Sequence, residues 1–342
     1  MSSSLKEVAA RAGVSARTVS NVVNGSARVS PHTRRRVQEA IDELGYRPNL
    51  AARSLRAGRT GIIGLAVPEL HSPYFGELAG LLVDEARRRS WTVIIEQTQG
   101  NAEFERRLLT GDSGRVMDGL IISPWALAAE ELTATAHTLP IVLLGECSSR
   151  GKADHVAVDS VAAADEATTH LLGLGRRRVA AIGLQPHLRN GTAQQRTEGY
   201  RRALQRAGIA PRPEWERAVA SLHRADGARA MTELLGGETV PDAVFAFSDE
   251  LALGAMHVAH LRGVRMPEQL AVVGFDDVED GRFSHPPLTT VSPDKRQIAQ
   301  RALQCLADRI YSPLNQVPAA TLTIAHRLLV RGSTVAQAQA CE

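Results

Sequence analysis

The spacing of hydrophobic positions along the chain changes once, near residue 60. Before that point apolar residues recur at helical spacing, which predicts short amphipathic helices. The first begins after Ser4, which forms a capping-box pattern with Glu7, and Gly13 supplies the turn into a second helix over about 16–23. A third helix starts at Pro31, a favoured first helical residue. Two short helices joined by a glycine turn and braced by a third are typical of a helix-turn-helix.

From residue 61 onwards, short continuous apolar runs alternate with amphipathic segments. Such runs are typical of parallel strands buried on both faces, and the helices between them indicate a doubly wound α/β fold. The runs form two successive sets, which predicts two lobes with a ligand site at the carboxyl ends of their strands. The expected strands are 62–67, 92–95, 119–122 and 141–144, then 156–158, 179–182, 243–246 and 271–275, with helices such as 194–207 and 250–262 among them.

The predicted fold class is an N-terminal all-α helix-turn-helix domain followed by a two-lobed α/β core. The predicted boundaries are 1–48 for the helix-turn-helix domain, 49–60 for a short helical linker, 61–334 for the core and 335–342 for a polar tail.

Charge is distributed unevenly between these parts. The net charge of the 342 residues is only +3, yet residues 1–60 carry eleven Lys and Arg against four acidic residues. The remainder carries 29 basic and 33 acidic residues. A basic N-terminal segment followed by a mildly acidic remainder is expected of a nucleic-acid-binding module joined to a domain with another function. A solvated basic surface on a plain three-helix cap is the alternative interpretation.

Several other classes of protein are not supported. No run of about eighteen apolar residues and no signal-peptide pattern is present, so we expect a cytoplasmic protein that does not enter a membrane. The three cysteines, Cys147, Cys305 and Cys341, lack metal-like spacing. No GxSxG, HExxH, P-loop or GxGxxG motif occurs. The sequence therefore predicts no enzyme, no cofactor and no metal site. A free-standing binding protein remains the alternative class. Such a protein would need an export signal and would have no use for a basic N-terminal module.

The expected second helix exposes Ala16, Arg17, Ser20 and Asn21 on one face. Arg can donate to guanine O6 and N7, and Asn can pair with adenine N6 and N7, so this face suits the major groove of DNA.

The same region closely resembles the lactose-repressor/galactose-repressor (LacI/GalR) family. The resemblance lies in the segments LKEVAARAGVSARTVS (5–20), VNG (23–25), VSPHTR (29–34) and LGYRPN (44–49). It implies that Ala16, Arg17 and Asn21 read bases, although the family usually has Arg where Asn21 stands. Thr18 and Ser20 suit phosphate contacts, which position the module without specifying sequence.

The linker resembles the hinge helix of that family, which becomes ordered on the operator. This resemblance implies that Leu55 enters the minor groove as an apolar wedge with Ala52 beside it, which kinks the duplex. Arg53 and Arg56 would then lie near phosphates. A plain interdomain linker is the alternative.

The core also resembles the family, which has a periplasmic-binding-protein-like fold. The matching segments are HSPYF (71–75), LLGLG (171–175), RTEGY (196–200), VGFDD (273–277), PPLTTV (286–291) and VRGST (330–334). The resemblance implies chain crossings between the lobes near 159–161, 288–292 and 320–323. The short Ala/Gln tail lacks leucine heptads, so a homodimer on a near-palindromic double-stranded DNA operator is expected.

The candidate effector-binding residues lie at strand ends. They are Tyr74, Phe75, Trp125 and Phe247, whose flat faces suit a sugar ring, together with Thr192, Arg196, Ser248 and Asp276. Arg196 and Asp276 match ligand-binding positions of the family, and a charged fork with a carboxylate suits vicinal hydroxyls. Core packing of the aromatics and a salt bridge in the cleft are the alternatives.

Three departures leave the usual sugar-binding set of the family incomplete. Gly145-Glu146 stands where many members have Asp, and Ser248 and Ser160 each stand where Asn is common. The resemblance therefore predicts a small-molecule effector, most readily a carbohydrate, and leaves its identity open. It also leaves open whether the effector releases or promotes DNA binding.

Overall fold

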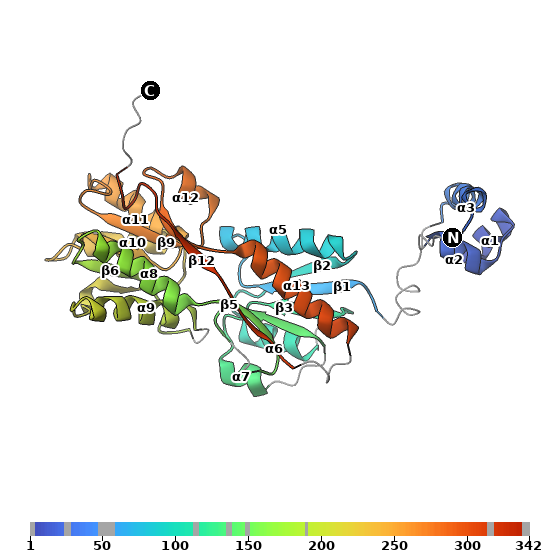
Figure 1. Cartoon of the computed structure of the whole chain (residues 1–342), viewed down its shortest axis with the longest axis horizontal. Helices are drawn as coiled ribbons and strands as arrows, with labels where there is room; N and C mark the ends of the chain where they lie inside the picture. The colour runs from blue at the N-terminus through green and yellow to red at the C-terminus, as the bar shows by residue number, and fades with distance from the viewer. Residues whose placement is uncertain are drawn as a thin grey trace, which may run out of the picture. The chain divides into compact units, whose positions relative to one another are not determined.

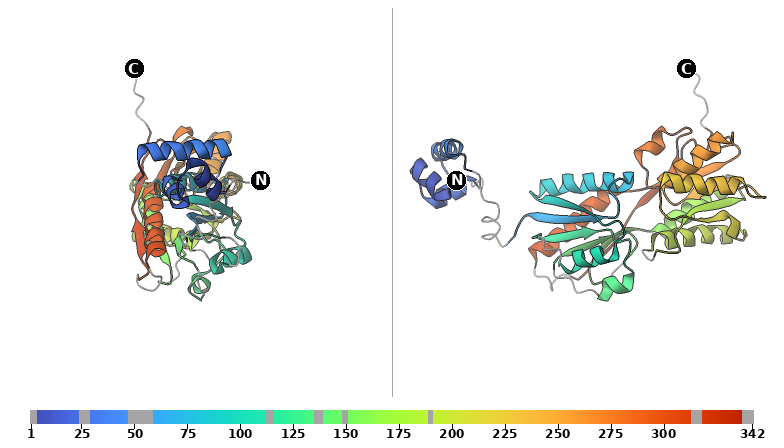
Figure 2. Two further views of the ribbon diagram at one scale, coloured as in Figure 1. Left: turned by 90° about the vertical axis from the view of Figure 1, so that its right-hand side faces the viewer. Right: turned by 180° about the vertical axis from the view of Figure 1, so that it is seen from behind.

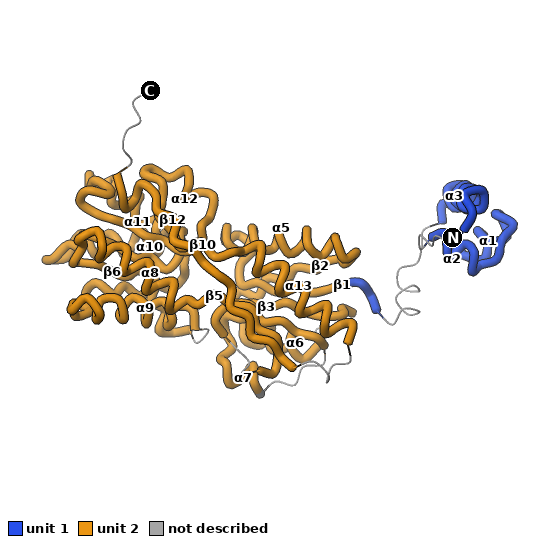
Figure 3. Tube along the Cα trace, in the orientation of Figure 1, with its two compact units in different colours: residues 1–61 blue, residues 62–342 orange. Residues whose placement is uncertain are grey.

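The computed structural model describes residues 4–23, 29–46, 59–111, 116–134, 139–147, 151–188, 191–312 and 318–336. The chain divides into two compact units, residues 1–61 and 62–342 (Figure 3). Among the described residues, no helix is both long enough and apolar enough to cross a membrane.

The first unit is built from three helices, α1 (Leu5–Ala12), α2 (Ala16–Val23) and α3 (Pro31–Leu44). The Ser4 and Glu7 capping box opens α1, and Gly13 ends it with φ 62°, a backbone conformation that favours glycine. Val8, Val19 and Val37 each come from a different helix and are fully buried against one another. This small core fixes α2 between its two neighbours, as the hydrophobic spacing predicts.

The second unit contains two six-stranded sheets, each covered by helices on both faces (Figures 1 and 2). The first sheet has the order β11-β5-β4-β3-β1-β2 with every pair parallel. Helices α5 and α13 pack on one face of it, and α6 and α7 cover the other. We call this sheet with its helices lobe 1. Its elements are β1 (Ile62–Val67), α5 (Pro73–Arg88), β2 (Thr92–Gln97), α6 (Ala102–Thr110), β3 (Gly119–Ile122), α7 (Ala129–Ala134), β4 (Ile141–Leu144), β5 (Asp154–Val158), α13 (Lys295–Tyr311) and β11 (Thr321–Ile324).

The second sheet, which with its helices forms lobe 2, has the order β12-β10-β9-β8-β6-β7, and only the β10–β12 pair is antiparallel. Helices α8 and α9 pack together, as do α10 and α11. The elements of lobe 2 are α8 (Ser160–Gly173), β6 (Val179–Leu184), α9 (Thr192–Arg206), a 3-10 turn η1 (Pro213–Trp215), β7 (Glu216–Ala218), α10 (Arg224–Leu235), β8 (Ala243–Ala246), α11 (Asp249–Leu261), β9 (Ala271–Phe275), α12 (Glu279–Phe283), β10 (Thr289–Pro293) and β12 (His326–Leu329).

The chain passes between the lobes three times. It crosses at Asp159, between β5 and α8, and returns at Asp294, between β10 and α13. It crosses again at Ala325, between β11 and β12. The last two positions lie slightly after the expected ranges 288–292 and 320–323, because β10 and β11 are each completed before the chain leaves its sheet.

Candidate functional site

The exposed face of α2 carries the residues expected to contact DNA. Val19 and Val22 point into the core of the first unit, whereas Ala16 and Arg17 are exposed and Thr18, Ser20 and Asn21 are partly exposed. The Ser15 hydroxyl accepts a hydrogen bond from the Thr18 amide at 3.1 Å and so caps the helix. The five expected residues therefore share the surface that the core leaves open. The hinge residues Ala52, Arg53, Leu55 and Arg56 lie outside the described residues.

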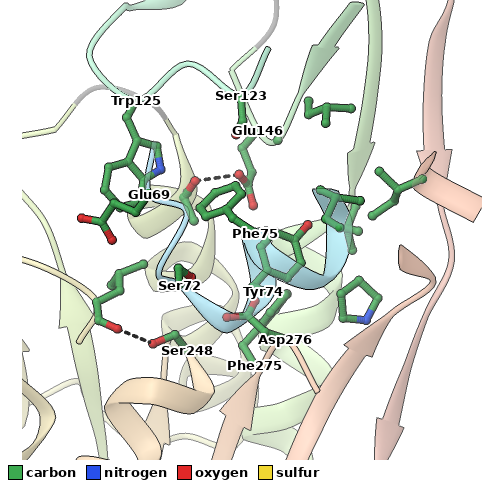
Figure 4. Close-up of a pocket in the computed structure, with 18 of the residues that line it drawn as sticks. Glu69, Ser72, Tyr74, Phe75, Ser123, Trp125, Glu146, Ser248, Phe275 and Asp276 are labelled. Carbon is green, nitrogen blue, oxygen red and sulfur yellow. Dashed lines mark hydrogen bonds between the residues drawn. The ribbon is translucent and has the colours of Figure 1, made fainter. Parts of the chain in front are cut away.

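A cavity lies between lobe 1 and lobe 2, at the carboxyl ends of the strands of both sheets (Figure 4). Residues that follow β1, β3 and β4 line it from lobe 1, and residues that follow β6, β7, β8 and β9 line it from lobe 2. The strand order reverses between β1 and β3 and between β6 and β8. Ligands of open α/β sheets bind at such switch points, so the cavity occupies the place that the fold favours for a ligand.

Lobe 1 supplies an aromatic wall. The rings of Tyr74 and Phe75 are 5.1 Å apart at 75°, and those of Phe75 and Trp125 are 6.2 Å apart at 76°. The amides of Trp125 and Ala126 donate to the Glu105 carboxylate at 2.9 and 3.1 Å. Glu105 is fully buried in α6, and this burial raises the pKa of its carboxyl. The Trp125 loop is thus held in place by a carboxylate beneath it.

Lobe 2 supplies Arg196, which is 7% exposed and lies on the first turns of α9. Its guanidinium carbon is 3.6 Å from the centre of the Phe275 ring, and its Nη1 donates to the Phe247 carbonyl. Its Nη2 lies 3.6 Å from the Glu146 carboxylate. Among the described residues, nothing accepts a hydrogen bond from its buried Nε.

Glu146 connects the two lobes. It follows β4 in lobe 1, yet its carboxylate accepts hydrogen bonds from Ser160 at 2.7 Å and Thr192 at 2.6 Å, both of which belong to helices of lobe 2. With Arg196 these contacts form a polar cluster at the cavity. The sequence showed Glu146 only as a departure from the usual Asp, and no local pattern indicated that it meets α8 and α9.

Asp276 projects from the end of β9 with φ 113°, an uncommon conformation for a residue that is not glycine. The Lys295 ammonium donates to its carbonyl at 2.9 Å. The buried Asp249 carboxylate accepts from the Val278 amide at 2.8 Å, which also holds this turn. Burial raises the pKa of the Asp276 carboxyl to about 7, although the charges of Arg196 and Lys295 oppose this effect. In the described residues no hydrogen bond reaches its carboxylate, which lines the cavity.

Two expected site residues are arranged differently. The Phe247 side chain is 1% exposed and packs in the core of lobe 2 against Gly183, so only its carbonyl, through Arg196, contributes to the site. The structure thus corrects the expectation of an aromatic face there. Ser248 lines the cavity, but its hydroxyl donates to the Leu222 carbonyl and accepts from the Leu251 amide, both at 3.1 Å. It therefore caps α11 and shapes the wall. Tyr74, Phe75, Trp125, Thr192, Arg196 and Asp276 all line the cavity.

A helix-turn-helix unit followed by a two-lobed core with a cavity between the lobes defines the class of ligand-responsive, DNA-binding transcription regulators. The chain matches the family model of bacterial regulatory proteins, lacI family, over residues 4–49, and that of a periplasmic binding protein-like domain over residues 168–334. It belongs to the lacI family of bacterial transcription regulators.

Relatives support this assignment over most of the chain. The transcriptional repressor PurR of Pasteurella multocida is 32% identical over 308 residues, which cover 90% of this chain and 91% of the relative. Catabolite control protein A of Priestia megaterium is 31% identical over 342 residues, and the alignment covers 98% of this chain and 100% of the relative. Among solved structures, the lac repressor dimer bound to operator and the anti-inducer ONPF has a TM-score of 0.85 at 27% identity, covering 98% of this chain and 100% of that chain. The CelR–cellobiose complex has a TM-score of 0.70 at 31% identity, covering 97% and 99%.

Proposed function

We propose that this regulator is a repressor whose affinity for operator DNA changes when a carbohydrate binds between lobe 1 and lobe 2. The observation that carries the proposal is the composition of the cavity, whose lining combines the aromatic wall of lobe 1 with the Arg196 guanidinium and with an Asp276 carboxylate that accepts no hydrogen bond from the described residues. A hydroxyl both donates and accepts hydrogen bonds, so a ring bearing several hydroxyls can pair with these groups while its apolar face packs on the aromatics. The chain acts by binding, without catalysis, in the cytoplasm where the DNA lies.

The solved relatives support the nature of the partners. One binds cellobiose, and another is a dimer on its operator. By extension we propose a homodimer of this chain on a near-palindromic operator, because a two-fold protein reads a two-fold site.

On the DNA side, we propose that Ala16, Arg17 and Asn21 contact base edges and that Thr18 and Ser20 contact phosphates. The exposure of this face of α2 supports that role. Leu55 would enter the minor groove as a wedge with Ala52 beside it, and Arg53 and Arg56 would lie near phosphates. A Leu55→Ser variant should bend the operator less while binding the effector unchanged, and unchanged bending in a circular-permutation gel assay would reject the wedge.

The experiment that tests the effector uses tryptophan fluorescence. Of the three tryptophans, Trp91 and Trp215 are buried in the cores, whereas Trp125 lines the cavity. Titration of mono- and disaccharides should therefore change the emission of the wild type and leave that of Trp125→Phe unchanged. Saccharides that bind should also shift operator affinity. If no saccharide changes the emission while a nucleobase does, the carbohydrate assignment is wrong although the site is right.

A further inference from the structure

A second group of side chains meets at the edge of the cavity and takes no part in the effector cluster. Glu69 and His71 lie in the turn between β1 and α5 of lobe 1, and His223 lies immediately before α10 of lobe 2. The Nε2 atoms of both histidines approach the same Glu69 oxygen, at 3.2 Å for His223 and 3.7 Å for His71. The two imidazole rings are 5.1 Å apart. One ligand atom from each residue lies within 4.8 Å of the other two.

These separations approach those of ligand atoms around a small metal ion. Zinc–nitrogen and zinc–oxygen bonds of about 2.0–2.1 Å in a tetrahedron place neighbouring ligand atoms about 3.3 Å apart. The His223–Glu69 distance already matches this edge. The exposed His71 side chain, which is 3.7 Å from Glu69 and within 4.8 Å of His223, has to rotate to bring both of its distances to this value. Two imidazoles and one carboxylate form a ligand set that zinc uses in proteins when it keeps a fourth position open.

We propose that Glu69, His71 and His223 form a binding site for a divalent transition-metal ion, with Zn²⁺ the best fit, that joins the two lobes. Imidazole suits zinc and its neighbours in the first transition series, whereas calcium and magnesium prefer oxygen ligands throughout. Because Glu69 and His223 also line the cavity, the fourth position faces the space between the lobes. A water molecule or an oxygen of a bound ligand completes the coordination there.

The surroundings keep the three ligands in place. The amide of Leu70 donates to the side-chain carbonyl of Gln97 at 2.9 Å, which fixes the turn that carries Glu69 and His71. Arg224, the residue next to His223, places its guanidinium on Glu250 and Asp280, at 2.7 and 2.8 Å. Its positive charge is therefore balanced by carboxylates of lobe 2, and it does not compete for Glu69.

The site spans two lobes, so the ion is held by all three ligands only when the lobes stand as close as they do here. A histidine–glutamate contact without metal that is partly exposed to water contributes little to stability. A coordinated ion would instead link the β1–α5 turn to α10. The inference goes beyond the effector and operator assignments and does not depend on either.

The test is a Zn²⁺ titration of the full chain, free of any affinity tag, in competition with a chromophoric chelator. The wild type should bind one Zn²⁺ per chain. Glu69→Gln, His71→Ala and His223→Ala should each weaken Zn²⁺ binding. Loss of a residue that only supports a metal ligand weakens binding by about 10–100-fold, and loss of a ligand should weaken it at least as much. His260→Ala, which removes an exposed histidine of α11, serves as the matched control and should bind as the wild type does. Zinc anomalous scattering from crystals should then show a single peak among the three residues.

Equal affinity in the wild type and the three ligand variants would overturn the proposal, as would a zinc peak elsewhere. If His223→Ala failed to fold, the isosteric Glu69→Gln and the exposed-turn variant His71→Ala would still decide the matter. Loss of binding on His223→Ala but not on His71→Ala would reject the three-ligand site in favour of a two-ligand contact.

Discussion

The two lobes share one strand order but present different chemistry to the space between them. In lobe 1 the order is β2-β1-β3-β4-β5, and in lobe 2 it is β7-β6-β8-β9-β10. After the first strand of its set, lobe 1 presents Tyr74 and Phe75, whereas lobe 2 presents Arg196. After the later strands, lobe 1 contributes Trp125 to the lining of the cavity and lobe 2 contributes Asp276.

The same α/β architecture therefore occurs twice, and its two copies contribute differently to ligand binding. The aromatic wall of lobe 1 offers apolar area, which favours binding with little regard to the pattern of polar groups. The charged groups of lobe 2 accept only ligands whose donors and acceptors match them, since an unmatched buried charge is costly. Lobe 1 should therefore set affinity and lobe 2 should set specificity. Lobe 1 also contributes two carboxylates, Glu146 in the polar cluster and Glu69 in the lining of the cavity.

The largest effect is expected from Arg196→Ala, which removes the charged centre of lobe 2. Arg196 and Glu146 are both about nine-tenths buried, so the substitution leaves a buried carboxylate without its cation. We expect the free energy of unfolding to fall by about 3–5 kcal/mol, measured by chemical denaturation. The matched control is Arg87→Ala in α5, whose ion pair with Asp84 is exposed on both sides and should cost less than about 1 kcal/mol. Equal losses of unfolding free energy in the two variants would show that the Glu146 cluster stabilises the fold no more than an exposed ion pair does.

Trp125→Ala tests the contribution of lobe 1. Removing an aromatic face that a ligand covers should weaken binding of every saccharide by about 1.5–3 kcal/mol, measured by calorimetry. The loss should be uniform across saccharides that differ in hydroxyl configuration. If the variant instead changed which saccharide binds best, the division between affinity and specificity would be wrong.

Arg17→Ala tests whether operator reading is independent of both lobes. We expect operator affinity to fall by about 1–3 kcal/mol and the preference for one guanine to relax, as seen in binding to an operator library. Saccharide binding in the absence of DNA should stay unchanged. A uniform loss on every DNA sequence would assign Arg17 to a phosphate instead.

The last effect is the pH dependence of stability that Asp276 introduces into lobe 2. Its pKa of about 7 in the folded chain lies above the value of about 3.9 expected for an unfolded chain. The protonated form is thus favoured by folding, so its stabilising contribution is complete below about pH 4 and is lost as the pH rises towards 7. Relative to Asp276→Asn, the wild type should lose at most about 1.4 kcal/mol per pH unit in this window and none above it. Denaturation curves of both proteins between pH 4 and 8 measure this, and a constant difference would contradict the shift.

Local patterns in the sequence identify much of this fold, because strands such as β3 and β4 are buried along their whole length and are therefore continuously apolar. The strands β7 and β11 escape prediction since they lie at or near sheet edges and mix exposed and partly buried residues.

The site is predictable only in part, for a related reason. Trp125 and Phe247 both follow buried strands. The Phe247 side chain, however, lies on the same face of the sheet as Phe245 and packs with it in the core, with their ring centres 5.3 Å apart. The roles of Glu146 and His223 depend on contacts between segments far apart in the chain, and no local spacing encodes such a meeting.

The central claim is that a ligand held between the lobes is coupled to operator binding. The most direct measurement is a titration of wild type and Asp276→Ala with a saccharide that changes Trp125 emission, with and without operator DNA. In the wild type, the saccharide should alter operator affinity by a coupling of about 1–3 kcal/mol, and operator should alter saccharide affinity by the same factor. Asp276→Ala should bind operator normally and lose the response, because its DNA contacts lie in the other unit. A variant that responds to the saccharide as the wild type does would contradict the account.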